Sequence, residues 1–377
     1  MSRVAREEKK KRTKDTDKES KKKDEKQPKK DSKKESKKET KRTVRKDGKL
    51  KADKETYREI DIIDLKVAFG KFFALKGVSF FANKREFLGV IGASGAGKTT
   101  VLRILTGQIG PTDGKAFVGG YDVTKKANLI SLLVGYVPQL EHLSLYYDFT
   151  ALQNAQFFGS MYGLRSKDIE IRAREVLTIL GFDEELMTKR VDRLSGGERK
   201  RVSICLGMIH KPPVLLLDEP TTGLDAHLRH ETLNYLKELN YKLGTTMVII
   251  SHDLEIVDYC TRVVLLEEGE ISQFGTPQEL ISSLPGKGES IKVTLRAMTP
   301  EIIRRIQSLE GVQYTAPAGR NAMKLFIDEP RDNLLPVIHQ LNEMKMPFDG
   351  VELVEADFFD YFQVKPWKQN GIGGTAS

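Results

Sequence analysis

The sequence predicts a mixed α/β protein in which a glycine-rich loop follows one strand of a parallel sheet, with a small α+β domain after it and a lysine-rich tail before it. Three observations support this prediction. Continuous apolar runs at 87–91, 214–217 and 246–250 are typical of strands buried on both faces of a parallel sheet. A glycine-rich segment follows the first run directly. The first 50 residues contain no aromatic residue and few aliphatic ones.

The lysine-rich tail, residues 1–56, differs from the remainder in charge. Its first 50 residues contain 23 basic and 11 acidic side chains, whereas the rest of the chain contains 39 basic and 42 acidic ones. Such a segment cannot bury enough apolar surface to offset its ordering entropy, so we expect it to be disordered. Its charge could contact anionic lipid headgroups or nucleic acid, or it could act only as a solubilising tail. It lacks the apolar stretch of a secretory signal.

Composition argues against a protein held by disulfides or a cysteine metal cluster, and against one that spans a membrane. The only cysteines, Cys205 and Cys260, fit a reducing compartment and offer neither a disulfide framework nor a metal cluster. No stretch approaches the roughly twenty apolar residues that are needed to span a bilayer. If the protein serves a membrane pathway, we expect that pathway to lie on another polypeptide.

The glycine-rich segment fits the phosphate-loop pattern G-x-x-x-x-G-K-[ST]. In such a loop backbone N–H groups surround phosphate, Lys98 reaches the β- and γ-phosphates, and Thr99 offers its hydroxyl to Mg²⁺. The strand at 87–91 and a helix predicted at 100–106 would place the phosphates at a helix N-terminus. The predicted loop consists of Gly92, Ala93, Ser94, Gly95, Ala96, Gly97, Lys98, Thr99 and Thr100. A glycine turn without a ligand is the alternative, which the flanking strand and helix disfavour.

A second buried run, Val214–Leu217, ends in the adjacent carboxylates Asp218 and Glu219. Adjacent acids at a strand end have separable roles in nucleotide hydrolysis, because one can hold Mg²⁺ while the other orients or deprotonates water. We assign Asp218 to the metal and Glu219 to the water. Two solvated acids would be the alternative, but the segment Pro-Thr-Thr-Gly-Leu-Asp at 220–225 is not generic loop sequence.

With these elements in this order, residues 60–280 resemble the nucleotide-binding subunit of an ABC transporter, a P-loop NTPase. The resemblance implies that Phe69 stacks on adenine, that Gln139 senses the γ-phosphate and Mg²⁺, and that His252 is the switch histidine. It also identifies Leu194–Glu198 with the family signature and Asp225 with a loop that communicates between subunits. The predicted catalytic residues are Glu219, Lys98, His252 and Gln139; the metal ligands are Thr99, Gln139 and Asp218; the ATP-binding residues are Phe69, Gly92 to Thr100, Ser195, Gly196, Gly197 and Asp225.

Two of these assignments have a structural alternative. Ser195 and the glycines that follow it could form a simple helix cap, although a cap requires only one such residue. Phe69 is one of three nearby phenylalanines, with Phe72 and Phe73, and could instead pack in the core.

The resemblance implies an ATPase that works as a homodimer or heterodimer with a second ABC ATPase copy. Each of two composite sites would combine the phosphate loop of one copy with the signature of the other. The dimer would drive a separate polytopic permease from the cytoplasmic face of a membrane. The sequences at 135–139 and 158–163 resemble those of exporter subunits, which favours export.

The alternative is a soluble ABC ATPase that acts on ribosomes, RNA or DNA through its basic tail. Because the chain has one cassette and no long insertion between Gly92 and Ser195, we do not expect a nucleic-acid partner.

The expected domains are the tail at 1–56, the ATPase at 57–285, a C-terminal domain at 286–366 and a flexible end at 367–377. The ATPase should combine an antiparallel layer, near 60–85 and 113–123, with a helical subdomain at 152–162 and 169–180. An exposed subset of its aromatic and apolar residues would form a socket for a partner helix; the candidates are Tyr146, Tyr147, Phe149, Phe157, Phe158 and Met161. After 286, the order strand, helix, strand, strand, helix, strand predicts a ferredoxin-like unit, closed by a short helix at 357–362.

Overall fold

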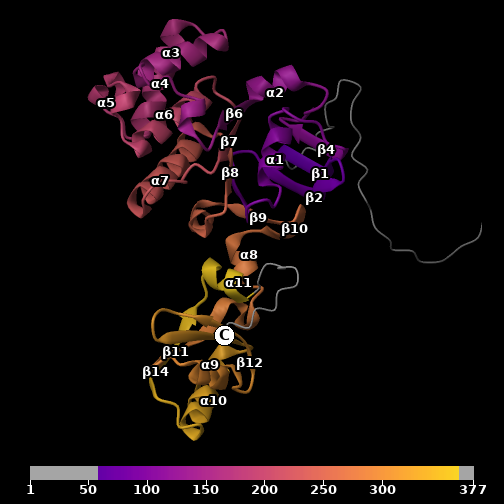
Figure 1. The fold of residues 1–377 in the computed structure, drawn as a ribbon, viewed down its shortest axis with the longest axis vertical. Coiled ribbons are helices and arrows are strands. Elements are labelled where there is room, and N and C mark those ends of the chain that lie inside the picture. The colour runs from indigo at the N-terminus through magenta and orange to yellow at the C-terminus, as the bar shows by residue number, and fades with distance from the viewer. Residues whose placement is uncertain (1–57, 365–377) are drawn as a thin grey trace, which may run out of the picture. The chain divides into compact units, whose positions relative to one another are not determined.

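The computed structural model describes residues 58–364, and Figure 1 labels its elements. The predicted disordered tail at 1–56 and the predicted flexible end at 367–377 lie outside the described residues. Within 58–364, no helix has both the length and the apolar character that crossing a bilayer requires.

The central sheet contains six strands in the order β10-β9-β3-β8-β7-β6. All neighbours are parallel except β10, which pairs antiparallel with β9 at one edge. Every residue of β3, β7 and β8 is buried, as expected for strands covered on both faces. The strands are β3 (Phe87–Ile91), β6 (Val134–Val137), β7 (Val214–Asp218), β8 (Thr246–Ser251), β9 (Arg262–Glu267) and β10 (Glu270–Gly275).

An antiparallel sheet, in the order β2-β1-β4-β5, forms the predicted second layer. It consists of β1 (Arg58–Phe69), β2 (Phe72–Asn83), β4 (Asp113–Val118) and β5 (Tyr121–Asp122). The turn between β1 and β2 contains Gly70 with a positive φ of 63°, and it pairs Phe69 with Phe72. Helix α1 (Lys98–Leu105) packs between the layers, where its Leu102 joins Leu65 and Val90 in one hydrophobic cluster. Helix α2 (Ala127–Leu133) precedes β6.

The predicted helical subdomain lies around α6, with α3, α4 and α5 gathered beside it (Figure 1). Its helices are α3 (Ala151–Met161), α4 (Ser166–Ile179), α5 (Glu184–Thr188) and α6 (Gly196–Met208), followed by α7 (Ala226–Leu243). Short 3₁₀ turns connect the elements: η1 (Glu141–Leu143), η2 (Val191–Arg193) and η3 (Leu254–Tyr259). Helix α8 (Pro277–Ile281) and η4 (Pro285–Gly288) then lead out of the central sheet.

The remaining elements confirm the predicted ferredoxin-like fold. Their order is β11 (Glu289–Leu295), α9 (Pro300–Gln307), β12 (Val312–Pro317), β13 (Ala322–Ile327), α10 (Pro330–Glu343) and β14 (Phe348–Glu355). The antiparallel sheet runs β12-β13-β11-β14, so the first and last strands of the unit are neighbours. The unit has its own core, which includes Ile291, Leu325 and Leu341.

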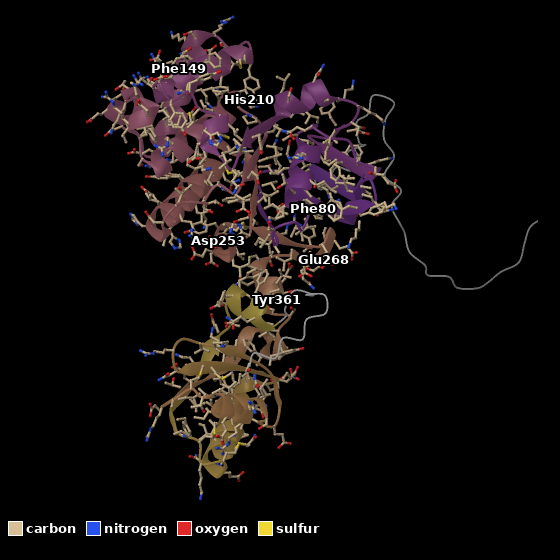
Figure 2. All side chains as sticks on the ribbon, in the orientation of Figure 1. Phe80, Phe149, His210, Asp253, Glu268 and Tyr361 are labelled. Carbon is tan, nitrogen blue, oxygen red and sulfur yellow. The ribbon has the colours of Figure 1, made fainter. Side chains whose placement is uncertain are left out.

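The closing helix α11 (Phe358–Val364) is fixed by polar and apolar contacts. Lys324 of β13 bonds to the buried carboxylate of Asp360 at 2.5 Å. Tyr361, labelled in Figure 2, belongs to the same hydrophobic cluster as Ile256 of η3 and Leu265 of β9. Helix α11 therefore packs against α8 and η3 as well as against β12.

Candidate nucleotide-binding site

One cleft gathers most of the predicted site residues. Its volume is about 690 Å³, within the usual range for a small-molecule site. The walls come from the β1–β2 hairpin, the loop after β3, and the segments that follow β6, β7 and β8. The lining residues are Phe69, Phe72, Ala74, Ala93, Ser94, Gly95, Gly97, Lys98, Thr99, Thr100, Gln139, Asp218, Glu219 and His252. Gly92 and Ala96, from the same loop, border an adjoining hollow.

The loop after β3 requires glycine at specific positions. Gly97 has a φ of 105°, and a Cβ there would lie 2.6 Å from the carbonyl oxygen of Ala74. A Cβ on Gly92 would lie 2.4 Å from the carbonyl oxygen of Leu266. Gly97 is the N-cap of α1 and provides no side-chain cap, so the N–H groups at this helix start face the cleft without a capping oxygen. That arrangement suits a phosphate group.

Lys98 is held by its own loop. Its Nζ donates to the carbonyl oxygens of Gly92 at 2.6 Å and Ala93 at 2.9 Å. Burial lowers the pKa of Lys98, while the carboxylates of Glu219 and Asp218 act in the opposite direction. To bind a phosphate, the ammonium group would have to exchange these carbonyl partners for phosphate oxygens.

Asp218 ends β7 with its side chain almost fully buried. The hydroxyl of Tyr136 donates to its Oδ2 at 3.3 Å. Burial raises the pKa of Asp218, and the Tyr136 bond opposes that effect. Burial and the neighbouring carboxylate in turn raise the pKa of Tyr136 to about 12. The sequence prediction missed Tyr136, because only the parallel pairing of β6 with β7 brings it beside Asp218.

Glu219 adopts a backbone conformation that is uncommon for a residue with a side chain, with a φ of 47°. Its N–H donates to the carbonyl of Ile250 at 2.9 Å, which fixes the turn to the end of β8. Its carboxylate lies 2.9 Å from Nδ1 of His252 and accepts weaker bonds from the hydroxyls of Ser251 and Thr222, both at 3.3 Å. A hydrogen bond between His252 and a carboxylate requires the proton on Nδ1. The Glu219 carboxylate and the His252 imidazole thus form a hydrogen-bonded pair at the carboxyl ends of the neighbouring strands β7 and β8.

The cleft also contains oxygen ligands that fit Mg²⁺. Thr99, Gln139 and Asp218 line it with oxygen atoms, the ligand type that Mg²⁺ prefers. Across residues 58–364, no group of three or more His, Cys, Asp and Glu side chains is arranged to hold a metal ion. Nucleotide-bound Mg²⁺ usually takes only one or two carboxylates and completes its shell with water and phosphate oxygens. The residues present therefore fit a magnesium–nucleotide complex better than a metal bound by protein alone.

Both phenylalanines of the hairpin turn are exposed on the cleft wall. Phe69 is 51% exposed and Phe72 is 63% exposed, so Phe69 is not a core residue. Phe72 was not predicted as a site residue; its pairing with Phe69 could have indicated it once a hairpin was assumed. Adenine stacking on Phe69 stays a prediction.

Four predicted ATP-binding residues lie outside this cleft, at helix starts. Ser195 caps α6: its Oγ accepts from the N–H of Glu198 at 3.2 Å, and the Glu198 carboxylate accepts from the N–H of Ser195 at 2.7 Å. Gly196 and Gly197 form the first turn of that helix. Asp225 caps α7 by accepting from the N–H of Leu228 at 2.9 Å. Within a single copy, these residues are not brought to the phosphate loop.

Comparison with known proteins identifies the family. A sequence profile described as ABC transporter matches residues 75–222. The linearmycin resistance ATP-binding protein LnrL of Bacillus subtilis (strain 168) is 36% identical over 250 residues, which cover 66% of this chain and 79% of that protein. The energy-coupling factor transporter ATP-binding protein EcfA2 of Caldanaerobacter subterraneus subsp. tengcongensis is 36% identical over 211 residues, which cover 55% of this chain and 73% of that protein.

Solved structures give the same result. CbiO1 of Clostridium perfringens, part of the ABC transporter complex cbiONQ, matches with a TM-score of 0.57 and 29% identity, covering 61% of this chain and 92% of that one. The ATP-binding cassette MJ0796, solved as a dimer bound to ADP and Pi, matches with a TM-score of 0.51 and 26% identity, covering 58% of this chain and 98% of that one. The phosphate loop, the acidic end of β7 and these relatives agree: the chain belongs to the ABC transporter ATP-binding proteins and is an ATPase subunit of that family.

Proposed function

We propose that this ATPase works as a dimer with two composite nucleotide sites and drives a separate membrane permease. The observation that supports the dimer is the division of the predicted site: Lys98 and Glu219 line the cleft, whereas Ser195 and Asp225 lie at helix starts outside it. Because helix N-termini favour anions, the start of α6 would contact a nucleotide held by a second copy. The MJ0796 cassette is a relative that was solved as a dimer. The second copy is either identical or a related ABC ATPase.

In the proposed reaction, Lys98 leaves the carbonyls of Gly92 and Ala93 and places its charge on the transferring phosphoryl group. Glu219 orients the attacking water and accepts its proton. His252 keeps the Glu219 carboxylate directed through its Nδ1–H, and Gln139 contacts the γ-phosphate side of the cleft. Thr99, Gln139 and Asp218 would hold Mg²⁺, which would supply neutralisation of phosphate charge.

The permease would dock on exposed apolar side chains that follow Gln139. Leu143 is 68% exposed and Met161 is 66% exposed, and Tyr146, Tyr147 and Phe149 are exposed to a smaller extent. The rings of Tyr146 and Phe149 lie 5.4 Å apart, and Phe149 is labelled in Figure 2. An exposed group of apolar residues fits the apolar face of a partner helix. The chain would then be a peripheral subunit on the cytoplasmic face of a membrane.

We propose export as the direction of transport. LnrL is named as a resistance protein, and YbhF of Escherichia coli (strain K12), 31% identical over 221 residues, is named as a probable multidrug transporter component. Other relatives, such as the iron importer subunit FbpC of Rhizobium etli, are named for import.

The proposal includes two further parts. The lysine-rich tail contacts anionic lipids. The ATPase domain ends at residue 285, and the C-terminal domain begins at residue 286.

The composite sites are tested with Glu219→Gln. The change removes the proposed base but leaves the binding residues, so turnover should fall by about a hundredfold or more. ATP should then convert the protein from monomer to dimer, as measured by size-exclusion chromatography with light scattering. The control is Glu238→Gln, which alters an exposed surface pair with Lys242 and should leave the rate unchanged. A variant that stays monomeric with saturating ATP would contradict the composite-site proposal.

The membrane partner is tested by purifying the tagged protein from detergent-solubilised membranes of its source organism. A copurifying polytopic membrane protein is expected. Recovery of ribosomal or nucleic-acid-bound material without such a protein would favour the soluble alternative. Transport by the isolated complex in vesicles of known orientation would then measure the direction.

A further inference from the structure

A buried lysine ties the signature helix to the segment that carries Gln139. Lys200 lies in α6, and its side chain is fully buried. Its Nζ donates to the main-chain oxygen of Gln139 at 2.6 Å. One turn later on the same helix face, the hydroxyl of Ser203 lies 2.8 Å from that of Ser144. Helix α6 is therefore held to residues 139–144 at two points.

The chemistry of this contact indicates a role in positioning. A buried ammonium group is costly unless it is hydrogen-bonded, and an apolar residue of similar volume would often be at least as stable. Burial lowers the pKa of Lys200, whereas the carboxylates of Glu141 and Asp218 raise it. Because the acceptor is a main-chain carbonyl, the bond fixes the backbone at Gln139 rather than a mobile side chain.

The two ends of this connection belong to different nucleotide sites in the proposed dimer. The side chain of Gln139 lines the cleft of its own copy. The N-terminus of α6, one turn before Lys200, carries Ser195 and the two glycines that would contact the nucleotide of the second copy. A displacement of the Gln139 segment would therefore be transmitted to the start of α6 through the Lys200 bond.

We propose that Lys200 is a positioning residue that couples the two nucleotide sites of the dimer. The inference rests on the composite-site dimer proposed above. A nucleotide that contacts Gln139 in one cleft sets the position of α6, and thereby prepares the signature of the same copy for the opposite cleft. Lys200 contributes to cooperativity between the sites and not to nucleotide affinity within a cleft.

The test uses Lys200→Met in the Glu219→Gln protein, where dimerisation can be measured without turnover. Two quantities are compared: the affinity of the monomer for a fluorescent ATP analogue, and the ATP concentration at half-maximal dimerisation. We expect the monomer affinity to change by less than about twofold and the half-maximal concentration to rise about tenfold, within the usual range of coupling between sites.

The matched control is Arg201→Met. Arg201 is the next residue of α6 and is also buried, but its guanidinium donates to the carbonyl of Leu180 at 3.0 Å, not to the Gln139 segment. This control loses a buried basic side chain from the same helix and should keep the half-maximal ATP concentration of the parent. Equal shifts for Lys200→Met and Arg201→Met would overturn the proposal in favour of a purely structural role.

Three further outcomes are decisive. A Lys200→Met protein that dimerises at the ATP concentration of its parent would overturn the coupling role alone. Failure of the parent Glu219→Gln protein to dimerise would instead contradict the proposed dimer. If Lys200→Met does not fold, Lys200→Leu, which is also uncharged and cannot donate a hydrogen bond, takes its place; a folded Lys200→Leu protein with a parent-like half-maximal concentration would also overturn the proposal.

Discussion

Asp218 and Glu219 are adjacent residues whose carboxylates differ in hydrogen bonding. Asp218 is buried at the end of β7 and accepts one long bond from Tyr136. Glu219 lies in a left-handed turn, and its carboxylate is bonded to His252. Burial with few partners suits a group that awaits a cation, whereas a fixed direction suits a group that orients water.

How far the sequence predicts this pair depends on which interactions are local. An apolar run that ends in two acids identifies both residues, because that pattern lies within one short segment. The φ of Glu219 and the bond from Tyr136 depend on β7 pairing with β8 and β6, which lie far away in the sequence. The order of strands in a sheet cannot be predicted from any single segment, so the φ of Glu219 and the Tyr136 bond are apparent only in the structure.

Asp218→Asn is expected to raise the Tm of the protein without nucleotide or metal at pH 7. The raised pKa of Asp218 means that its ionised form is disfavoured in the folded state, so this carboxyl reduces stability as the pH rises through its titration range. A neutral amide removes that cost and can still accept the Tyr136 bond. We expect a Tm increase of about 2 °C or more, measured by differential scanning fluorimetry, together with loss of ATPase activity.

The same variant has a built-in pH control. The Tm difference should shrink as the pH falls into the range where the wild-type carboxyl also becomes protonated. Asp253→Asn provides a structural control, because Asp253 is paired with Arg229 at 2.9 Å and caps η3, so its replacement should lower the Tm or leave it unchanged. A lower Tm for Asp218→Asn at pH 7 would mean that its carboxylate stabilises the fold.

At the scale of elements, the β1–β2 hairpin decides which aromatic residue faces the cleft. The sequence places three phenylalanines close together and does not indicate which of them faces the cleft. The register pairs Phe69 with Phe72 across the turn and Phe73 with Ala68. Because neighbouring side chains on a strand point to opposite faces, Phe72 lines the cleft while Phe73 does not. A one-residue change of register would exchange them.

Phe69→Ala is expected to raise the KM for ATP about tenfold or more, the usual effect of losing one base–aromatic stacking contact. The kcat should change little, since the phosphate loop and Glu219 remain in place. Steady-state ATPase kinetics measure both constants. Phe73→Ala is the matched control, because Phe73 is similarly exposed, at 48%, but does not line the cleft. If both variants raise the KM equally, the hairpin acts through its fold and not through adenine stacking.

At the scale of the whole molecule, the sequence predicts the parts better than the contacts between them. Each strand and helix of the C-terminal unit has its own apolar pattern, and the predicted order of six elements matches the observed one. The sheet order places β11 beside β14, as in the predicted ferredoxin-like unit. The packing of Tyr361 into the cluster that contains Ile256 was not predicted, because it joins residues more than 100 positions apart.

The predicted nucleotide site also limits what the lysine-rich tail can do. Within residues 58–364, every residue that lines the cleft lies between Phe69 and His252, so removal of residues 1–50 should leave the kcat and the KM for ATP unchanged within about twofold, whereas lipid binding should fall. Co-sedimentation with vesicles of anionic lipid, at low and high salt, measures the second effect, and vesicles of neutral lipid are the control. Because the first 50 residues contain 23 basic and 11 acidic side chains, wild-type binding should weaken as salt rises. Equal binding of both proteins to anionic vesicles would leave the tail without a lipid role, and a large loss of ATPase activity would mean that the tail takes part in the catalytic site.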